Sequence, residues 1–136
     1  MFGWFRKWKN ALRLLSGESD KLHLRLSRKR CPLNAPGAFY TTGNCMACEA
    51  PESEAPDLLA PLTGGNLTTY FVRQPETPEE VERACRAIEV CCVMDLRYGG
   101  TDRAIIERLG NSPNATDYVV QGDSLVRVNR ADSGTA

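Results

Sequence analysis

Residues 77–92, TPEEVERACRAIEVCC, contain the clearest structural signal in the chain. Thr77 is placed to cap a helix, Pro78 suits its first position, and Glu80 completes a capping-box pattern. The apolar side chains that follow recur at helical spacing and predict one buried face: Val81, Ala84, Cys85 and Ile88. Cys85 is therefore expected to be a small core side chain rather than a ligand.

The predicted helix ends on two adjacent cysteines, Cys91 and Cys92. Upstream, within the stretch CPLNAPGAFYTTGNCMACEAPESEAPDLLA (31–60), Cys45 and Cys48 are separated by two residues. This spacing allows two thiolates to bind one metal centre, because the turn between them brings both sulfurs to the same side. The pair lies in a loop after a short apolar stretch, and Cys91 follows Cys48 by forty-three residues at the end of a well-capped helix.

Short elements of both kinds are predicted around this helix. Strands are expected at GAFYT (37–41), LTTYFVRQ (67–74) and VMDLRY (93–98), and a brief helix at SEAPDLLA (53–60). A second short helix is expected at TDRAIIERLG (101–110), capped by Thr101 or Asp102 and closed by Gly110. DYVVQGDSLVRV (117–128) predicts a hairpin that turns at residues 121–123.

Charge divides the chain into two unequal parts, although the formal net charge is zero. Residues 1–30 carry nine Lys and Arg against two acidic residues, whereas the remainder carries eight Arg against fifteen Asp and Glu. This division favours a basic arm that meets an anionic surface and an acidic body that meets a cationic partner.

The basic arm begins with a predicted amphipathic helix. One face is apolar and the other carries Arg and Lys; the apolar positions are Met1, Phe5, Trp8, Leu12 and Leu15. Two interpretations fit: a helix that lies in a membrane interface through residues 1–16, or a terminal helix that covers the core of its own domain. Residues 22–26 then alternate as a half-buried strand, in which His23 faces away from the leucines and receives no chemical role.

The N-terminal charges, the chain length and the absence of catalytic motifs indicate the expected cellular compartment and class of function. Arg6, Lys7 and Lys9 interrupt the apolar start, so a signal peptide is not predicted and the six cysteines are expected in a reducing cytoplasm, with peripheral membrane association as the alternative. With 136 residues, one modest domain plus an arm is expected. One histidine and no phosphate-binding motif argue against an enzyme, and three basic residues at 28–30 are too few to predict nucleic-acid binding.

Several longer stretches together resemble the bacterial single-cluster ferredoxins, which are small iron–sulfur electron carriers. The matching stretches are NAPGAFYTTGNCMAC, EAPDLLA, RQPETPEEVERACRAIEVC and VMDL, and they cover residues 34–96. The resemblance implies an α+β, ferredoxin-like small domain with short strands and two to three helices, in addition to the N-terminal amphipathic helix. It divides the chain into an arm and strand (1–30), a ferredoxin-like domain (31–98) and a C-terminal helix and hairpin extension (99–136).

The same resemblance implies the ligands of a cluster. Cys45, Cys48 and Cys91 match cluster ligands of the family, but the third loop ligand is replaced by Pro51. Three thiolates are compatible with a three-iron cluster, or with a four-iron cluster whose open iron takes water, hydroxide or a carboxylate such as Glu49 or Glu52.

Cys92 stands where the family has a proline, and it is an alternative further metal ligand. A zinc site formed by Cys45, Cys48, Cys91 and Cys92 is a second alternative, although adjacent residues on extended chain point to opposite sides.

Two functions follow from this degenerate ligand set. The first is a one-electron carrier that docks on a redox partner with a basic surface. The second is a ferredoxin-like interaction module that has lost its cluster and binds no cofactor.

Overall fold

Helix α3 (Pro78–Val90) forms as its sequence predicts. The Thr77 hydroxyl accepts a hydrogen bond from the backbone N–H of Glu80 at 3.1 Å, and the Glu80 carboxylate accepts one from the N–H of Thr77 at 3.2 Å. Both partners of the capping box are therefore in place. The helix buries Ala84, Cys85, Ala87 and Ile88, while Val81 is half-buried at the edge of the core.

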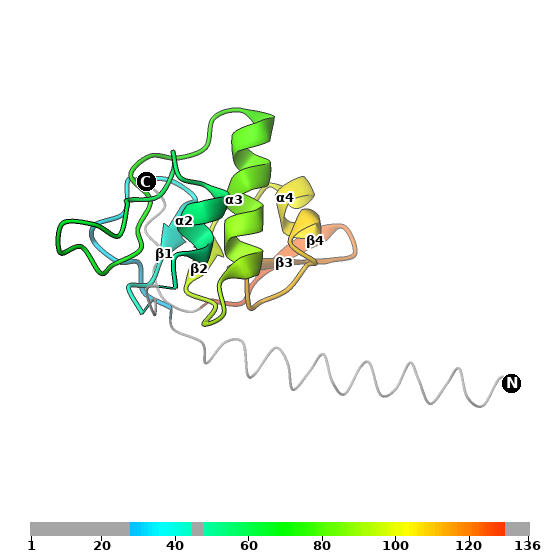
Figure 1. Cartoon of the computed structure of the whole chain (residues 1–136). Coiled ribbons are helices and arrows are strands. Elements are labelled where there is room, and N and C mark those ends of the chain that lie inside the picture. Colours follow the sequence, from blue (N-terminus) through cyan, green and yellow to red (C-terminus); the bar gives the residue numbers. More distant parts are fainter. Residues whose placement is uncertain (1–27, 45–47, 130–136) are drawn as a thin grey trace, which may run out of the picture.

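The computed structural model describes residues 28–44 and 48–129, and within them the chain is a small α+β structure (Figure 1). Besides α3, the elements are β1 (Phe39–Thr41), α2 (Ala50–Glu54), β2 (Leu96–Tyr98), α4 (Arg103–Arg108), β3 (Tyr118–Gln121) and β4 (Ser124–Arg127). The predicted helix at residues 1–16 and strand at 22–26 lie outside the described residues.

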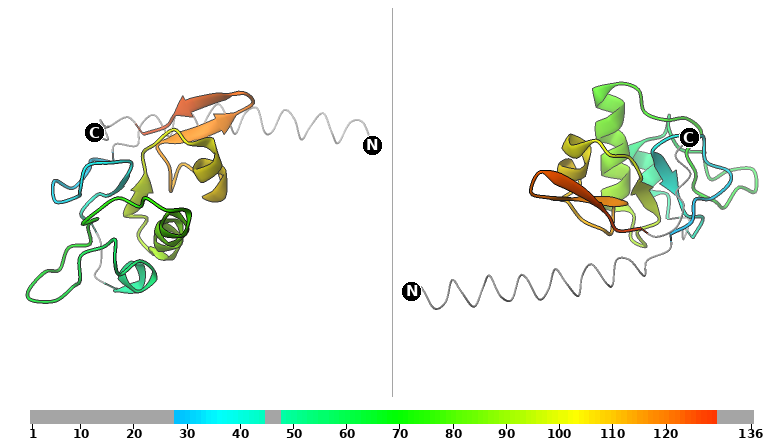
Figure 2. Two further views of the ribbon diagram at one scale, coloured as in Figure 1. Left: turned by 90° about the horizontal axis from the view of Figure 1, so that it is seen from above. Right: turned by 180° about the vertical axis from the view of Figure 1, so that it is seen from behind.

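Two small antiparallel sheets carry the described strands. β1 pairs with β2, so that Phe39 lies opposite Tyr98, and β3 pairs with β4 in a hairpin. The predicted hairpin is confirmed, and Gly122 takes the positive φ of 60° that its tight turn requires. The hairpin and α2 lie on opposite sides of α3 (Figure 2).

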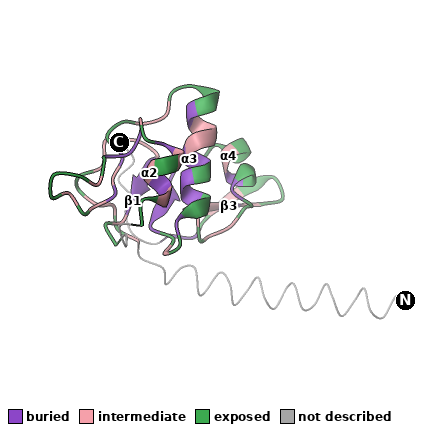
Figure 3. Cartoon of the chain, in the orientation of Figure 1, coloured by how far each residue is buried: buried purple, intermediate pink, exposed green. Residues whose placement is uncertain are grey.

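One hydrophobic cluster joins these elements. Phe39 of β1 contacts Tyr98 of β2, with ring centroids 4.9 Å apart, and it also packs against Phe71. The buried residues of α3 belong to the same cluster as these aromatic side chains, and Figure 3 colours buried parts of α3 and β1 purple. Ile106 and Leu109 belong to the same cluster, so the segment after residue 98 shares its core with the segment before it.

The predicted strand at 67–74 is wrong. Within this stretch only Phe71 forms a β-bridge, to Leu59. The Phe71 N–H donates to the side chain of Asn34, and its carbonyl accepts from the N–H of Ala35. Phe71 is thus bonded to the loop on one side, and its neighbours Tyr70 and Val72 are bonded to Ala60 and Leu58 on the other, but pairing does not extend into a longer strand.

The brief helix after the cysteine loop starts earlier than predicted. α2 ends at Glu54, because Pro56 disfavours helical backbone at the residue before it. In α4, by contrast, the predicted limits hold: the Asp102 side chain caps the helix, and Gly110, with a φ of 82°, lies just after its end.

Candidate functional site

The cysteine loop starts directly after β1 and is held in place by Asp95. The Asp95 carboxylate accepts hydrogen bonds from the backbone N–H of Thr42 at 3.2 Å and of Asn44 at 2.8 Å, and also from the Thr42 hydroxyl. Asp95 itself is 1% exposed. Since it lies four residues after Cys91, it ties the start of the loop to the end of α3.

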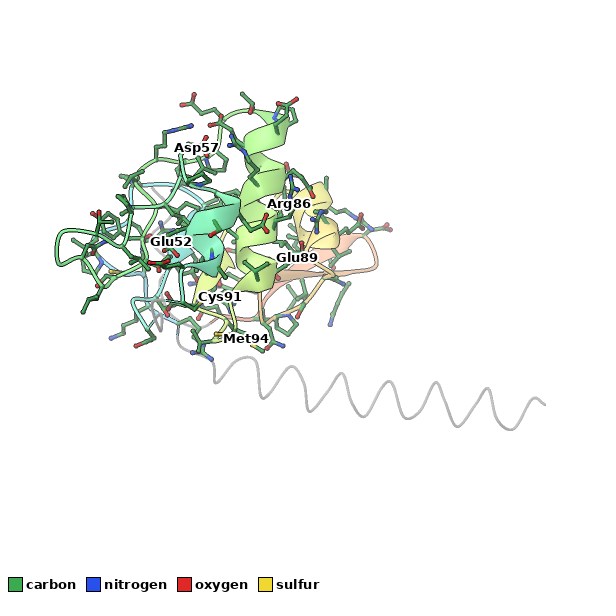
Figure 4. All side chains as sticks on the ribbon, viewed as in Figure 1. Glu52, Asp57, Arg86, Glu89, Cys91 and Met94 are labelled. Atoms are coloured by element: carbon green, nitrogen blue, oxygen red, sulfur yellow. The ribbon has the colours of Figure 1, made fainter. Side chains whose placement is uncertain are left out.

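Cys91 occupies the C-terminal cap of α3. Its sulfur accepts a hydrogen bond from the backbone N–H of Asp95 at 3.2 Å. The turn that permits this contact contains Met94 in a left-handed conformation, with a φ of 55°. Figure 4 shows Cys91 and Met94 together at this end of the helix. Because such N–H donors stabilise negative charge on sulfur, the local geometry suits a thiolate ligand.

Three cysteines gather at this end of α3. The pKa of Cys92 is raised by desolvation of its thiol, then by the charge of Cys48 and a hydrogen bond with it, and finally by Cys91. The loop cysteine Cys48 is thus a neighbour of the helix-end pair, although the chain separates them by more than forty residues. Cys48 and Cys92 are exposed, whereas Cys91 is 7% exposed.

The predicted ligand set is only partly within the described structure. Cys45 lies outside the described residues, and among the described ones no group of three His, Cys, Asp or Glu side chains could hold a metal ion. Cys91 also belongs to the hydrophobic cluster. The donor chemistry, thiols with an N–H donor to Cys91, fits an iron–sulfur cluster, and a complete site would need Cys45 beside Cys48 and Cys91.

The residues after Cys48 show what replaces the third loop ligand. Pro51 is buried at the start of α2, and Glu49 precedes it with a left-handed φ of 66°. Glu52 accepts a hydrogen bond from the Thr69 hydroxyl at 2.6 Å and, with Glu49, lines a cleft of about 220 Å³. Among the described residues, the walls of this cleft include Leu59 and no cysteine. The other carboxylate oxygen of Glu52 is buried and has no hydrogen-bond partner among them.

The described residues contain two further cysteines. Cys85 is fully buried in the core, as predicted, and burial raises the pKa of its thiol to about 11. Cys31 is half-buried, and its backbone N–H donates to the Thr41 carbonyl at 2.8 Å. The Cys31 side chain lies beside Gly43 of the cysteine loop, whereas Cys85 has no exposed surface. His23 lies outside the described residues.

Sequence reasoning missed Asp95 as a residue of this site. A signal was present, since an acidic residue interrupts the apolar stretch VMDL just after the two cysteines. It also missed a cleft of about 320 Å³ beside Cys91, whose walls include Met94, Leu109 and Asn114. Leu109 and Asn114 come from the segment after residue 98, so that segment contributes to the surroundings of Cys91.

No protein family, curated protein or solved structure matches this chain. Among the described helices, none has the length and apolar character needed to cross a membrane.

Proposed function

We propose that this protein is a ferredoxin-like iron–sulfur protein that acts as a one-electron carrier. The observation that supports this function is the position of Cys48 beside the end of α3, where Cys91 and Cys92 lie. A remote cysteine delivered by a helix to a cysteine loop is the arrangement that the sequence resemblance implies.

The protein residues have separate roles in this proposal. Cys45, Cys48 and Cys91 hold the cluster, and Cys92 is the alternative further ligand. The cluster supplies the one-electron couple. The N–H of Asp95 stabilises charge on the Cys91 sulfur, and the Asp95 carboxylate holds the start of the loop against the helix end. Exposure of Cys48 brings the site to the surface, where a redox partner with a basic surface can approach.

Anaerobic purification followed by iron and acid-labile sulfide analysis tests this function. The expected preparation is brown, with iron and sulfide near stoichiometric with protein. Cys45→Ser should bleach it and lower its unfolding temperature, whereas Cys85→Ala, at a cysteine buried in the core, should leave the colour unchanged. Zinc analysis of the same samples separates an iron site from a zinc site. Reconstituted protein that contains neither iron nor sulfide would exclude the electron carrier.

The second candidate function is a cluster-free protein-interaction module. The packing of Cys91 favours it, because this residue is only 7% exposed and belongs to the hydrophobic cluster. Under this alternative, protein side chains alone pack around Cys91, and no cofactor is required to complete the core. Under this alternative the reconstituted protein stays colourless, and Cys45→Ser has the same unfolding temperature as the wild type.

A further inference from the structure

Helix α2 and the residue before it carry three glutamates, two of which line a partly apolar cleft. Glu49, at the N-cap of the helix, and Glu52 line the cleft, and Glu54 is the last residue of the helix. The cleft has a volume of about 220 Å³, and its apolar walls are formed by Pro56, Leu59, Pro61 and Leu62. This surface therefore combines negative charge with an apolar hollow.

These glutamates have no cationic partner within the described structure. None of the three takes part in an ion pair among the described residues, whereas Asp57, a little further along the chain, pairs with two arginines. One carboxylate oxygen of Glu52 accepts the Thr69 hydroxyl, and the other is buried with no hydrogen-bond partner in the part of the chain that the structure describes. Because a buried polar atom without a partner is unfavourable, a cation bound at this cleft would stabilise it.

The basic arm has the complementary composition. All four lysines and both tryptophans of the chain lie within residues 1–30. In the predicted helix at residues 1–16, the apolar face includes Trp8, and Lys7 and Lys9 flank it in the sequence. An aromatic side chain suits the apolar walls of the cleft, and the neighbouring ammonium groups suit the glutamates.

The described chain starts close enough to this surface for the arm to reach it. The Cys31 N–H donates to the Thr41 carbonyl at 2.8 Å, and the Thr41 hydroxyl donates to the Thr69 carbonyl at 2.7 Å. The Thr69 hydroxyl in turn donates to Glu52, so three successive hydrogen bonds connect the start of the body with the cleft. Residues 17–27 join the predicted helix to the first described residue, and a linker of that length spans up to about 40 Å when extended.

We propose that residues 1–16 dock on α2 and the adjacent cleft of the same chain, with their apolar face against the cleft walls and their lysines against the glutamates. This inference does not depend on the proposed electron-carrier function. It bears on that function because Glu49 directly follows Cys48. The docked arm covers the acidic surface beside the cysteine loop and competes there with a basic redox partner.

A carbodiimide cross-linker tests the contact, because it joins an amine directly to a carboxylate that touches it. Since no lysine occurs in the body of the chain, a link from Lys7 or Lys9 to a body carboxylate identifies where the arm docks. In the monomer of the full chain at low salt, we expect tandem mass spectrometry to find these lysines joined to Glu49, Glu52 or Glu54. Links from them only to other carboxylates, only between two chains, or no links at all would overturn the proposal.

Tryptophan fluorescence gives a second readout, since both tryptophans lie in residues 1–16. Docking should shift their emission to shorter wavelength, and Glu49→Lys should return it toward that of an exposed indole. The matched control is Asp123→Lys, an equal change of charge at an exposed position in the turn of the β3–β4 hairpin, which lies on the other side of α3 from α2 (Figure 2). It should leave the emission unchanged, and circular dichroism checks that both variants are folded.

Two fluorescence results would contradict the docked arm. Equal emission from Glu49→Lys and Asp123→Lys would mean that the arm does not recognise the charge on α2. Emission of an exposed indole in the wild type, shifted to shorter wavelength only by vesicles that contain anionic lipid, would instead support the membrane-surface interpretation of residues 1–16.

Discussion

Asp117 is a buried carboxylate that accepts hydrogen bonds from three other buried side chains. Arg97 pairs with it at 3.0 Å, and both side chains are 1% exposed. The Tyr40 hydroxyl donates to it at 2.7 Å, and the Asn129 amide donates at 3.0 Å. Burial of Tyr40, and then the charge of Asp117, raise the pKa of the phenol well above its ordinary value. These hydrogen bonds connect β1, β2 and the segment that follows β4.

Asp117→Ala should lower the free energy of unfolding by about 3–5 kcal/mol, because it leaves the Arg97 charge buried without its carboxylate. Urea unfolding followed by circular dichroism measures the loss. The matched control is Glu107→Ala, which breaks an exposed ion pair with Arg103 on α4 and should cost below about 1 kcal/mol. If both variants lost the same free energy of unfolding, burial would not be the reason why the Arg97–Asp117 pair matters for stability.

At the scale of elements, the first turn of α3 is linked to the preceding loop by Glu80. One carboxylate oxygen accepts the N–H of Thr77 within the capping box, and the other pairs with Arg73. The hydrogen bond from Arg73, supported by backbone donors at Thr77 and Glu76 against the opposing effect of burial, lowers the pKa of Glu80 to about 2. The folded protein therefore stabilises the ionised carboxylate of Glu80 relative to its protonated form.

This lowered pKa predicts a stability contribution that depends on pH. It is fully present above about pH 4.5, the ordinary value, and is lost as the pH falls toward about 2. We expect the difference in unfolding free energy between wild type and Glu80→Gln to be largest near neutral pH and to shrink through this window. Urea unfolding at a series of pH values measures it.

Glu79→Gln is the control for the Glu80 experiment, because Glu79 lies in the same first turn but is exposed. It removes one favourable charge at the helix N-terminus without removing the contact with Arg73. A Glu80→Gln difference that stays constant from pH 7 to pH 2 would contradict the role of ionised Glu80.

At the scale of the whole molecule, the arm and the body carry opposite charges. The body of the described structure exposes acidic side chains on α3, including Glu89, beside Arg86 on the outer face shown in Figure 4. Several of these acids are paired, since Arg108 of α4 contacts both Glu82 and Glu89. The basic residues of the arm lie in the sequence before this body.

If residues 1–16 form a membrane-surface helix, the full chain should sediment with vesicles that contain anionic lipid. Raising the salt concentration should weaken this binding, because the attraction of Lys and Arg to the headgroups is screened. The chain without residues 1–16 is the control and should remain in the supernatant. Equal sedimentation of both chains would support the other interpretation, in which this segment covers its own domain.

Features that depend on residues close together in sequence could be predicted without a structure. The start of α3 follows from Thr77, Pro78 and Glu80, and the β3–β4 hairpin follows from alternating residues on both sides of Gly122. Capping boxes and tight turns are formed by residues only a few positions apart, so the local sequence is sufficient to predict them. The spacing of Cys45 and Cys48 is a signal of the same local kind.

The tertiary structure decided the features that require partners distant in sequence. Residues 67–74 have the composition of a strand, yet no neighbouring strand pairs with them along their length. The proximity of Cys48 to Cys92, and the burial of Asp95 beneath the start of the cysteine loop, depend on residues more than forty positions apart in the sequence. Whether a backbone segment pairs as a strand, and whether a side chain is desolvated, depends on which distant parts of the chain pack against it. A local sequence pattern contains no information about those distant partners.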